Sequence, residues 1–362
     1  MDDEYGKMDS AGEVYIHPTP LRLEAGQVLK NAKLCYNTYG KLNDARDNVL
    51  VVNHALTGNS SLHGWWGELL GPGKAFDTSR YFIVCSNILG SCYGSTGPMD
   101  INPDTGRQYR MAFPDISVRD TVNIQIALLK SLNVRSVKCV VGGSFGGMQT
   151  LEFMLHEAAP SFIRSAAPIA CGAHHTAWQI GISETQRQAI YADANWLGGN
   201  YEPSRPPTAG LNVARQIGMV TYRTAKGFES KFGRSVSEGS APFGSQSKWA
   251  VKSYLEYQGE KFLTRFDPIT YIKLTEQMDS HDVGRLRGGV RTALAQCKIP
   301  ALVVGISSDV LYPLHEQLEL YAMLGSSAKK MVVVESDAGH DGFLLEQEQV
   351  GKALTDFLAT ID

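Results

Sequence analysis

The sequence predicts an α/β fold in which helices cover both faces of a mostly parallel, doubly wound sheet that carries a helical insertion. Short apolar runs rich in β-branched residues alternate with longer helix-forming stretches. The runs are continuous rather than alternating, which is typical of parallel strands buried on both faces. Such runs stop between about residues 172 and 296 and resume before the C-terminus. This order indicates one sheet interrupted by a helical segment.

Five of the apolar runs are expected to be strands of that sheet: 49–52, 81–85, 137–141, 301–304 and 331–334. Because these runs lie on both sides of the helical segment, residues 1–171 and 297–362 are expected to form one catalytic domain.

Residues 172–296 are expected to form a helical lid inserted into this domain. Breaker-rich stretches at 198–207 and 239–244 separate helix-forming pieces of the segment. One helix start is explicit, because Asp267 is a good N-cap and Pro268 suits the first helical position.

Composition limits the classes of partner. With 362 residues, 43% of them hydrophobic, the chain can bury a large core. Its net charge is only -3, from 34 basic and 37 acidic residues, so neither nucleic acid nor a membrane surface is an expected partner. The first residues are acidic and no apolar run follows them, and the six cysteines lack metal-ligand spacing. We therefore expect a cytoplasmic protein with reduced, buried thiols and no bound metal.

A nucleophile motif stands between the third run and a helix-forming stretch. Residues 142–146 read Gly-Gly-Ser-Phe-Gly, a G-x-S-x-G pattern with Ser144 at its centre. In the α/β-hydrolase fold this pattern forms a sharp strand-to-helix turn that exposes the serine, and glycines flank it because side chains would collide with the turning backbone. Ser144 is therefore the predicted nucleophile.

A serine needs a base to take its proton and an acid to hold that base. In this fold the acid and the histidine follow the serine in that order, each after a later strand. Asp309 follows the 301–304 run and His340 follows the 331–334 run. The long gap between Ser144 and Asp309 accommodates the lid. Asp309 and His340 are thus the predicted partners of Ser144.

Two backbone N–H groups should stabilise the oxyanion of the reaction. One belongs to Phe145, which follows the nucleophile, and the other is expected in an early loop after a strand. Residues 53–58, Asn-His-Ala-Leu-Thr-Gly, supply that loop, and Leu56 is the candidate donor.

Longer strings resemble the homoserine O-acetyltransferase family over nearly the whole chain. They comprise residues 53–58, 64–66, 71–74, 87–98, 142–149, 253–262, 265–268 and 339–344. One departure is Phe145, where many relatives carry Met, although its backbone N–H would serve equally well.

The resemblance implies a ping-pong reaction without a bound cofactor. Ser144 would take the acetyl group from acetyl-CoA, the co-substrate, and pass it to the hydroxyl of L-homoserine, with His340 as the base in both steps. Leu56 and Phe145 would hold the oxyanions. The family's acceptor contacts match Arg215 and Tyr222 for the carboxylate.

Asp341 matches the family's contact to the acceptor's ammonium group. The residues offer independent support, because Arg215 and Tyr222 are two helical turns apart and so share a face, and Asp341 adjoins His340. The resemblance also implies a homodimer through the lid, and apolar residues on more than one face of a helical insertion favour the same arrangement.

Alternatives remain within and outside the family. The acceptor could be serine or a larger alcohol such as a deacetylated cephalosporin, and the donor could be succinyl-CoA. A serine esterase or thioesterase would use the same three residues, because water can also deacylate the intermediate. Transfer requires an acceptor held in place and water excluded, a role that a lid can fill.

Overall fold

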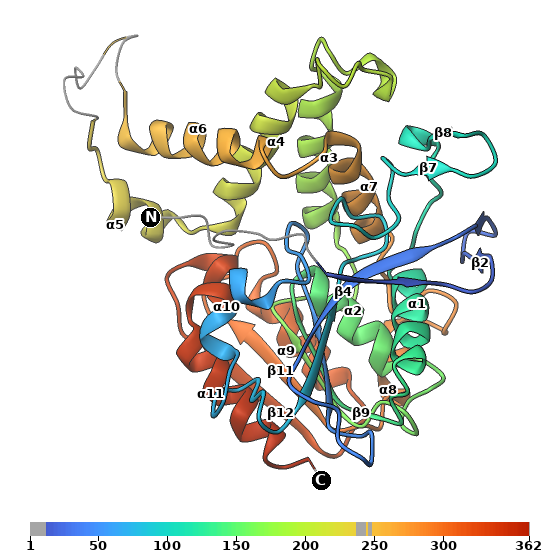
Figure 1. Ribbon diagram of the computed structural model, residues 1–362. Coiled ribbons are helices and arrows are strands. Elements are labelled where there is room, and N and C mark those ends of the chain that lie inside the picture. Colours follow the sequence, from blue (N-terminus) through green and yellow to red (C-terminus); the bar gives the residue numbers. More distant parts are fainter. Residues whose placement is uncertain (1–11, 237–243, 245–247, 362) are drawn as a thin grey trace.

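A twisted eight-stranded sheet lies below a group of helices in the computed structural model, which describes residues 12–236, 244 and 248–361 (Figure 1). The strand order is β1-β4-β6-β5-β9-β10-β11-β12. These strands span Glu13–Ile16 (β1), Lys33–Tyr39 (β4), Val49–Asn53 (β5), Phe82–Ser86 (β6), Val137–Gly143 (β9), Ala166–Ile169 (β10), Ala301–Ile306 (β11) and Lys329–Val334 (β12). Two short hairpins lie outside the sheet: Leu21–Arg22 (β2) with Val28–Leu29 (β3), and Ile101–Asn102 (β7) with Arg107–Gln108 (β8).

The pairing from β6 to β12 is parallel throughout, and near one edge β4 alone runs against the other strands, antiparallel to both β1 and β6. The predicted α/β class with a mostly parallel sheet is confirmed. All five predicted runs are strands of this sheet.

Helices cover both faces of the sheet, as the pattern predicts (Figure 1). The helices span Val118–Ser131 (α1), Phe145–Met154 (α2), Ala177–Tyr191 (α3), Thr208–Tyr222 (α4), Ala225–Phe232 (α5), Ala250–Leu263 (α6), Pro268–Asp279 (α7), Val290–Gln296 (α8), Leu314–Met323 (α9), Gly342–Leu345 (α10) and Gln347–Leu358 (α11). Alternate strand residues enter two separate cores. One core lies against α1, α2, α8 and α9, and the other lies against α10 and α11. Among the described helices, none is both long and apolar enough to span a membrane.

The segment 172–296 holds α3 to α8. Helix α4 packs against both α3 and α6 above the sheet (Figure 1). Asp267 caps α7 as predicted, accepting a 2.8 Å hydrogen bond from the N–H of Thr270, with Pro268 at the first turn. Helix α8 returns to the sheet domain, where Leu294 is buried in the core beside α9. Apart from Gly244, the predicted breaker-rich stretch 239–244 lies outside the described residues.

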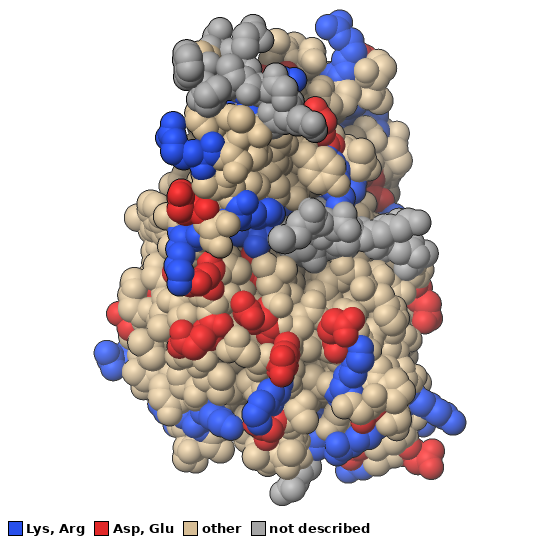
Figure 2. Space-filling view, turned by 90° about the vertical axis from the view of Figure 1, so that its left-hand side faces the viewer, with Lys and Arg blue, Asp and Glu red and all other residues tan. Residues whose placement is uncertain are grey.

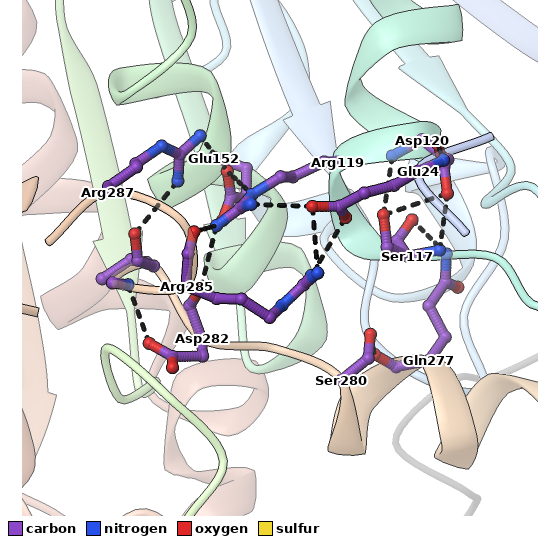
Figure 3. Close-up of polar contacts among 12 residues, drawn as sticks. Glu24, Ser117, Arg119, Asp120, Glu152, Gln277, Ser280, Asp282, Arg285 and Arg287 are labelled. Carbon is purple, nitrogen blue, oxygen red and sulfur yellow. Dashed lines mark hydrogen bonds and ion pairs between the residues drawn. The ribbon is translucent and has the colours of Figure 1, made fainter. Parts of the chain in front are cut away.

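Five charged residues tie the end of the lid segment to the sheet domain, and we call them the anchor cluster (Figure 3). Arg119 on α1 pairs with Glu24 at 2.8 Å and with Glu152 on α2 at 3.2 Å. Arg287 pairs with Glu152 at 2.8 Å, and Arg285 pairs with Glu24 at 2.9 Å. Glu152 is only 3% exposed, so the loss of either arginine would leave a buried charge poorly compensated. The cluster therefore fixes the loop between α7 and α8 against α1 and α2.

Candidate active site

Ser144 lies on a strained turn between β9 and α2. Its backbone has φ 57° and ψ -121°, which few side-chain-bearing residues adopt. A Cβ on Gly146 would lie 2.1 Å from the carbonyl oxygen of Asn53, and one on Gly142 would lie 2.2 Å from the carbonyl oxygen of Gly146. The flanking glycines therefore allow the close backbone contact that the motif predicted.

The structure brings Ser144, His340 and Asp309 into one hydrogen-bonded chain. Asp309 follows β11, and His340 lies in the short 3-10 helix Gly339–Asp341 after β12. The Nε2 of His340 is 2.8 Å from the Ser144 Oγ, and its Nδ1 is 2.7 Å from the Asp309 Oδ2. With Nδ1–H donating to the carboxylate, Nε2 can accept the serine proton. This is the geometry that activates a serine nucleophile.

Neighbouring groups fix Asp309 and His340. The Oδ1 of Asp309 accepts hydrogen bonds from the N–H groups of Leu311 at 2.9 Å and Tyr312 at 2.8 Å. The ring centroid of Tyr312 is 5.2 Å from that of His340, and its hydroxyl is 2.8 Å from the Nε2 of buried His175. The acid and the imidazole are thus held in place before any substrate arrives.

The environment raises the pKa of His340 above its ordinary value of 6.5. Burial alone would lower it, but the charge of Asp309 and its hydrogen bond, together with the charge of Asp341, outweigh burial. The rings of Tyr222 and Tyr312 also face the imidazole. Since only neutral imidazole can accept the serine proton, the reactive form is depleted as the pH falls through this raised pKa.

Acylation of Ser144 by p-nitrophenyl acetate is therefore expected to increase with pH through a midpoint above 6.5. Asp341→Asn removes one of the charges that raise the pKa of His340, so it should move the midpoint to lower pH. Stopped-flow rates of p-nitrophenol release between pH 5 and 9 would test this. A midpoint below 6.5 in the unmodified protein, or the same midpoint in both proteins, would contradict the assignment of His340 as the base.

The two predicted oxyanion donors belong to residues that lie near Ser144. Phe145 is the first residue of α2, where a backbone N–H has no partner within the helix. Leu56 lines the same small cavity as Ser144 and His340. Both positions suit donors to an oxyanion formed at Ser144.

His54 supports the loop of Leu56, a role that sequence reasoning did not assign. Its Nδ1 donates to the carbonyl of Ala55 at 2.8 Å, and its Nε2 accepts from the N–H of Ile88 at 3.2 Å. Complete burial lowers the pKa of His54 to about 4, so the ring stays neutral and keeps both bonds. Its position directly after a strand was the one available signal.

Of the three residues predicted to bind the acceptor substrate, two line the cavity beside Ser144 and one lies behind it. Tyr222 and Asp341 line the cavity of 30 Å³ beside Ser144. Arg215 is 1% exposed and lies behind Tyr222, with its guanidinium carbon 5.9 Å from the Tyr222 ring centroid and 5.1 Å from that of Phe262. Arg215 and Tyr222 therefore share a helix face, as their spacing predicted.

Arg223 is a site residue that sequence reasoning missed. Its Nε is 2.8 Å from the Oδ2 of Asp341, whose side chain is 4% exposed. A carboxylate has two oxygens and several acceptor positions, so Asp341 can pair with Arg223 and still accept from an ammonium group.

Comparison with known proteins shows the fold and the family of the chain. The family model described as alpha/beta hydrolase fold matches residues 48–347. The homoserine O-acetyltransferase of Chloroherpeton thalassium is 47% identical over 339 residues, which are 94% of this chain and 87% of that protein. The crystal structure of homoserine O-acetyltransferase from Bacillus anthracis has the same fold, with a TM-score of 0.88 at 24% identity over 96% of this chain and 97% of that one.

A hydrolase also shares the fold. The crystal structure of esterase E22 matches with a TM-score of 0.87 at 25% identity, covering 96% of this chain and 99% of that one. The two solved structures are equally distant in sequence, but the 47% identity to the relative from Chloroherpeton thalassium shows that the chain belongs to the homoserine O-acetyltransferase family, built on the α/β-hydrolase fold.

Proposed function

We propose that this protein transfers an acetyl group from acetyl-CoA to the hydroxyl of L-homoserine, a step of methionine biosynthesis, through an acetyl-Ser144 intermediate. The observation that carries the proposal is the Ser144–His340–Asp309 hydrogen-bond chain in a member of this family. The reaction requires acetyl-CoA as a co-substrate and no bound cofactor.

In the first half-reaction the Ser144 Oγ attacks the thioester carbon while His340 takes the serine proton. The negative charge on the carbonyl oxygen is stabilised by the N–H groups of Leu56 and Phe145. When the intermediate collapses, the carbon–sulfur bond breaks and His340 returns its proton to the sulfur. CoA leaves as the thiol, and an acetyl ester remains on Ser144.

In the second half-reaction the homoserine hydroxyl gives its proton to His340 and attacks the acetyl carbon. The same two N–H groups hold the second oxyanion, and the proton then returns to the Ser144 oxygen as the product ester leaves. Arg215 and Tyr222 would hold the carboxylate of homoserine, and Asp341 would hold its ammonium group. Orientation by these groups favours the hydroxyl over water.

A serine esterase is the second candidate, because esterase E22 shares this fold. Free thiol released from acetyl-CoA, measured with homoserine, with serine and without an acceptor, separates the candidates. We expect fast release only with homoserine. Equal release in all three reactions would identify a thioesterase, and preference for serine would identify a different acceptor.

The lid is expected to form the contact surface of a homodimer. Val213 and Val220 are two turns apart on α4, and Tyr257 lies on α6, and all three are about half exposed. Light scattering after size exclusion should give twice the 39.5 kDa chain mass, because these apolar faces gain a partner. Val220→Glu should yield monomer, whereas Ile101→Glu, at a somewhat more exposed position on β7, should not. A monomer at micromolar concentration in the unmodified protein would contradict the prediction.

A further inference from the structure

A second cavity lies where the lid meets the loop of the catalytic histidine. It measures 330 Å³, and we call it the α5 cavity after the helix that forms one wall. Its principal lining residues are Lys226, Phe228, Lys231 and Phe232 of α5 and Tyr254 of α6. This volume is within the range of small-molecule sites, whereas the 30 Å³ beside Ser144 is not.

The α5 cavity adjoins the reaction site. Asp337 and Ala338 line it, and His340 follows them in the chain. Because consecutive Cα atoms are about 3.8 Å apart, the backbone of Ala338 lies within about 7.6 Å of that of His340. Helix α5 is fixed to this loop, since the Oγ1 of Thr224 donates to the carbonyl of Asp337 at 2.6 Å.

Arg223 lies between the two cavities. It lines the α5 cavity and pairs with Asp341, which lines the cavity of Ser144. The Arg223–Asp341 pair is therefore the contact that joins the linings of the two cavities.

The lining combines aromatic rings with ammonium groups. The ring centroids of Phe228 and Phe232 are 5.7 Å apart, and those of Phe232 and Tyr254 are 5.0 Å apart. The Nζ of Lys231 is 4.3 Å from the Tyr254 ring centroid. Aromatic faces stack on nucleobases and lysines bind phosphate, so this lining suits an adenine nucleotide.

The positively charged side chains that line the α5 cavity attract a ligand only at short range. Positive and negative side chains are interspersed over the face that carries α5 (Figure 2), so no single-sign field draws anions there. Lys226 pairs with Asp337 at 2.7 Å, but these side chains are 75% and 62% exposed. Such a pair is screened by water, and Lys226 can exchange the carboxylate for a phosphate at little cost. Glu346 also lines the cavity, which leaves three basic residues against two acidic ones.

We propose that the α5 cavity binds the adenosine phosphate end of the acetyl-CoA donor, with the pantetheine arm passing Arg223 to Ser144. The proposal rests on the function proposed above and names the part of that site which recognises the donor. Lys226 and Lys231 hold phosphates, and the rings of Phe228, Phe232 and Tyr254 hold the base.

The test reverses both exposed charges in Lys226→Glu/Lys231→Glu. Because two phosphate contacts become repulsive, KM for acetyl-CoA should increase about tenfold or more, with kcat little changed. With S-acetylpantetheine, which lacks the nucleotide, the two proteins should react equally. The control is Lys352→Glu on α11, where the side chain is also 75% exposed and no effect is expected.

Two outcomes would overturn the inference. One is an unchanged KM for acetyl-CoA in the double variant. The other is an equal loss with S-acetylpantetheine, because that would place the effect on the lid rather than on the nucleotide.

Direct binding separates this inference from the proposed function. If the unmodified protein released no thiol from acetyl-CoA, the proposed function would fail. Isothermal titration calorimetry with CoA itself would still test binding at the α5 cavity. Binding that is lost in the double variant supports the assignment. Equal binding by the two proteins, or no binding to the unmodified protein, rejects it.

Discussion

Ser144→Ala is expected to reduce kcat/KM for acetyl transfer by about 10⁴-fold or more, because the hydroxyl that forms the covalent intermediate is gone. The unmodified protein mixed with acetyl-CoA alone should gain the mass of one acetyl group. Intact-protein mass spectrometry should find no such gain in the variant. The neighbouring His340 and Asp309 remain in place, so the loss should arise in chemistry rather than folding.

A cysteine thiol is the main alternative site for the acetyl group. Five of the six are buried and Cys92 is partly exposed, and burial raises the pKa of the Cys92 thiol to about 12. A thiol in this state is a poor nucleophile at neutral pH. Peptide mapping should place the acetyl group on Ser144, and Ser131→Ala, an exposed serine at the end of α1, should acylate normally. An acetyl group found on a cysteine would refute the assignment.

Arg215→Ala is expected to lower kcat/KM for homoserine about 30-fold or more while the acylation of Ser144 continues. A free amino acid brings a carboxylate that is costly to desolvate unless it is paired, and truncating one partner of a buried charged pair costs about 2–5 kcal/mol. The two half-reactions are measured separately, by the rate of acetyl-enzyme formation and by the homoserine dependence of its decay.

Because Arg215 is 1% exposed among aromatic rings, the alanine variant also leaves a void. Arg215→Met retains most of the packing and should show the same loss with homoserine, whereas Arg215→Lys retains the charge but not the two-pronged hydrogen bonding. Thermal unfolding of all three variants identifies those that fold. Slow acylation with unchanged homoserine saturation would assign Arg215 to the donor side or to the scaffold.

The strands that sequence reasoning found and missed differ in composition. The runs that form β5, β6, β9 and β11 are continuous and β-branched, as burial on two faces requires, and β12 has a similar run although it is a partly exposed edge strand. Strand β10 was missed because it reads Ala-Ala-Pro-Ile, and a proline argues against a central strand. Pro168 lies opposite Gly142 in the sheet, so its place follows from the neighbours rather than from local propensity.

The candidate site likewise contains residues that sequence reasoning found and residues that it missed. Ser144, Asp309 and His340 were predictable, because strand order in this fold places each after a particular strand. His54 and Arg223 were not, since their roles depend on contacts with Ile88 and Asp341, far away in the sequence. No local pattern encodes such pairs.

The anchor cluster has a mechanical consequence. Glu152 lies on the same helix that begins directly after Ser144, and two arginines join it to α1 and to the loop where the lid segment returns to the sheet domain. The nucleophile helix and that return loop are therefore held to each other through one buried carboxylate. Tyr222 of α4 lines the 30 Å³ cavity from the lid side and takes no part in these charged pairs. The charged pairs therefore brace the helix that begins at the strained turn of Ser144, and a fixed nucleophile favours attack on a bound substrate.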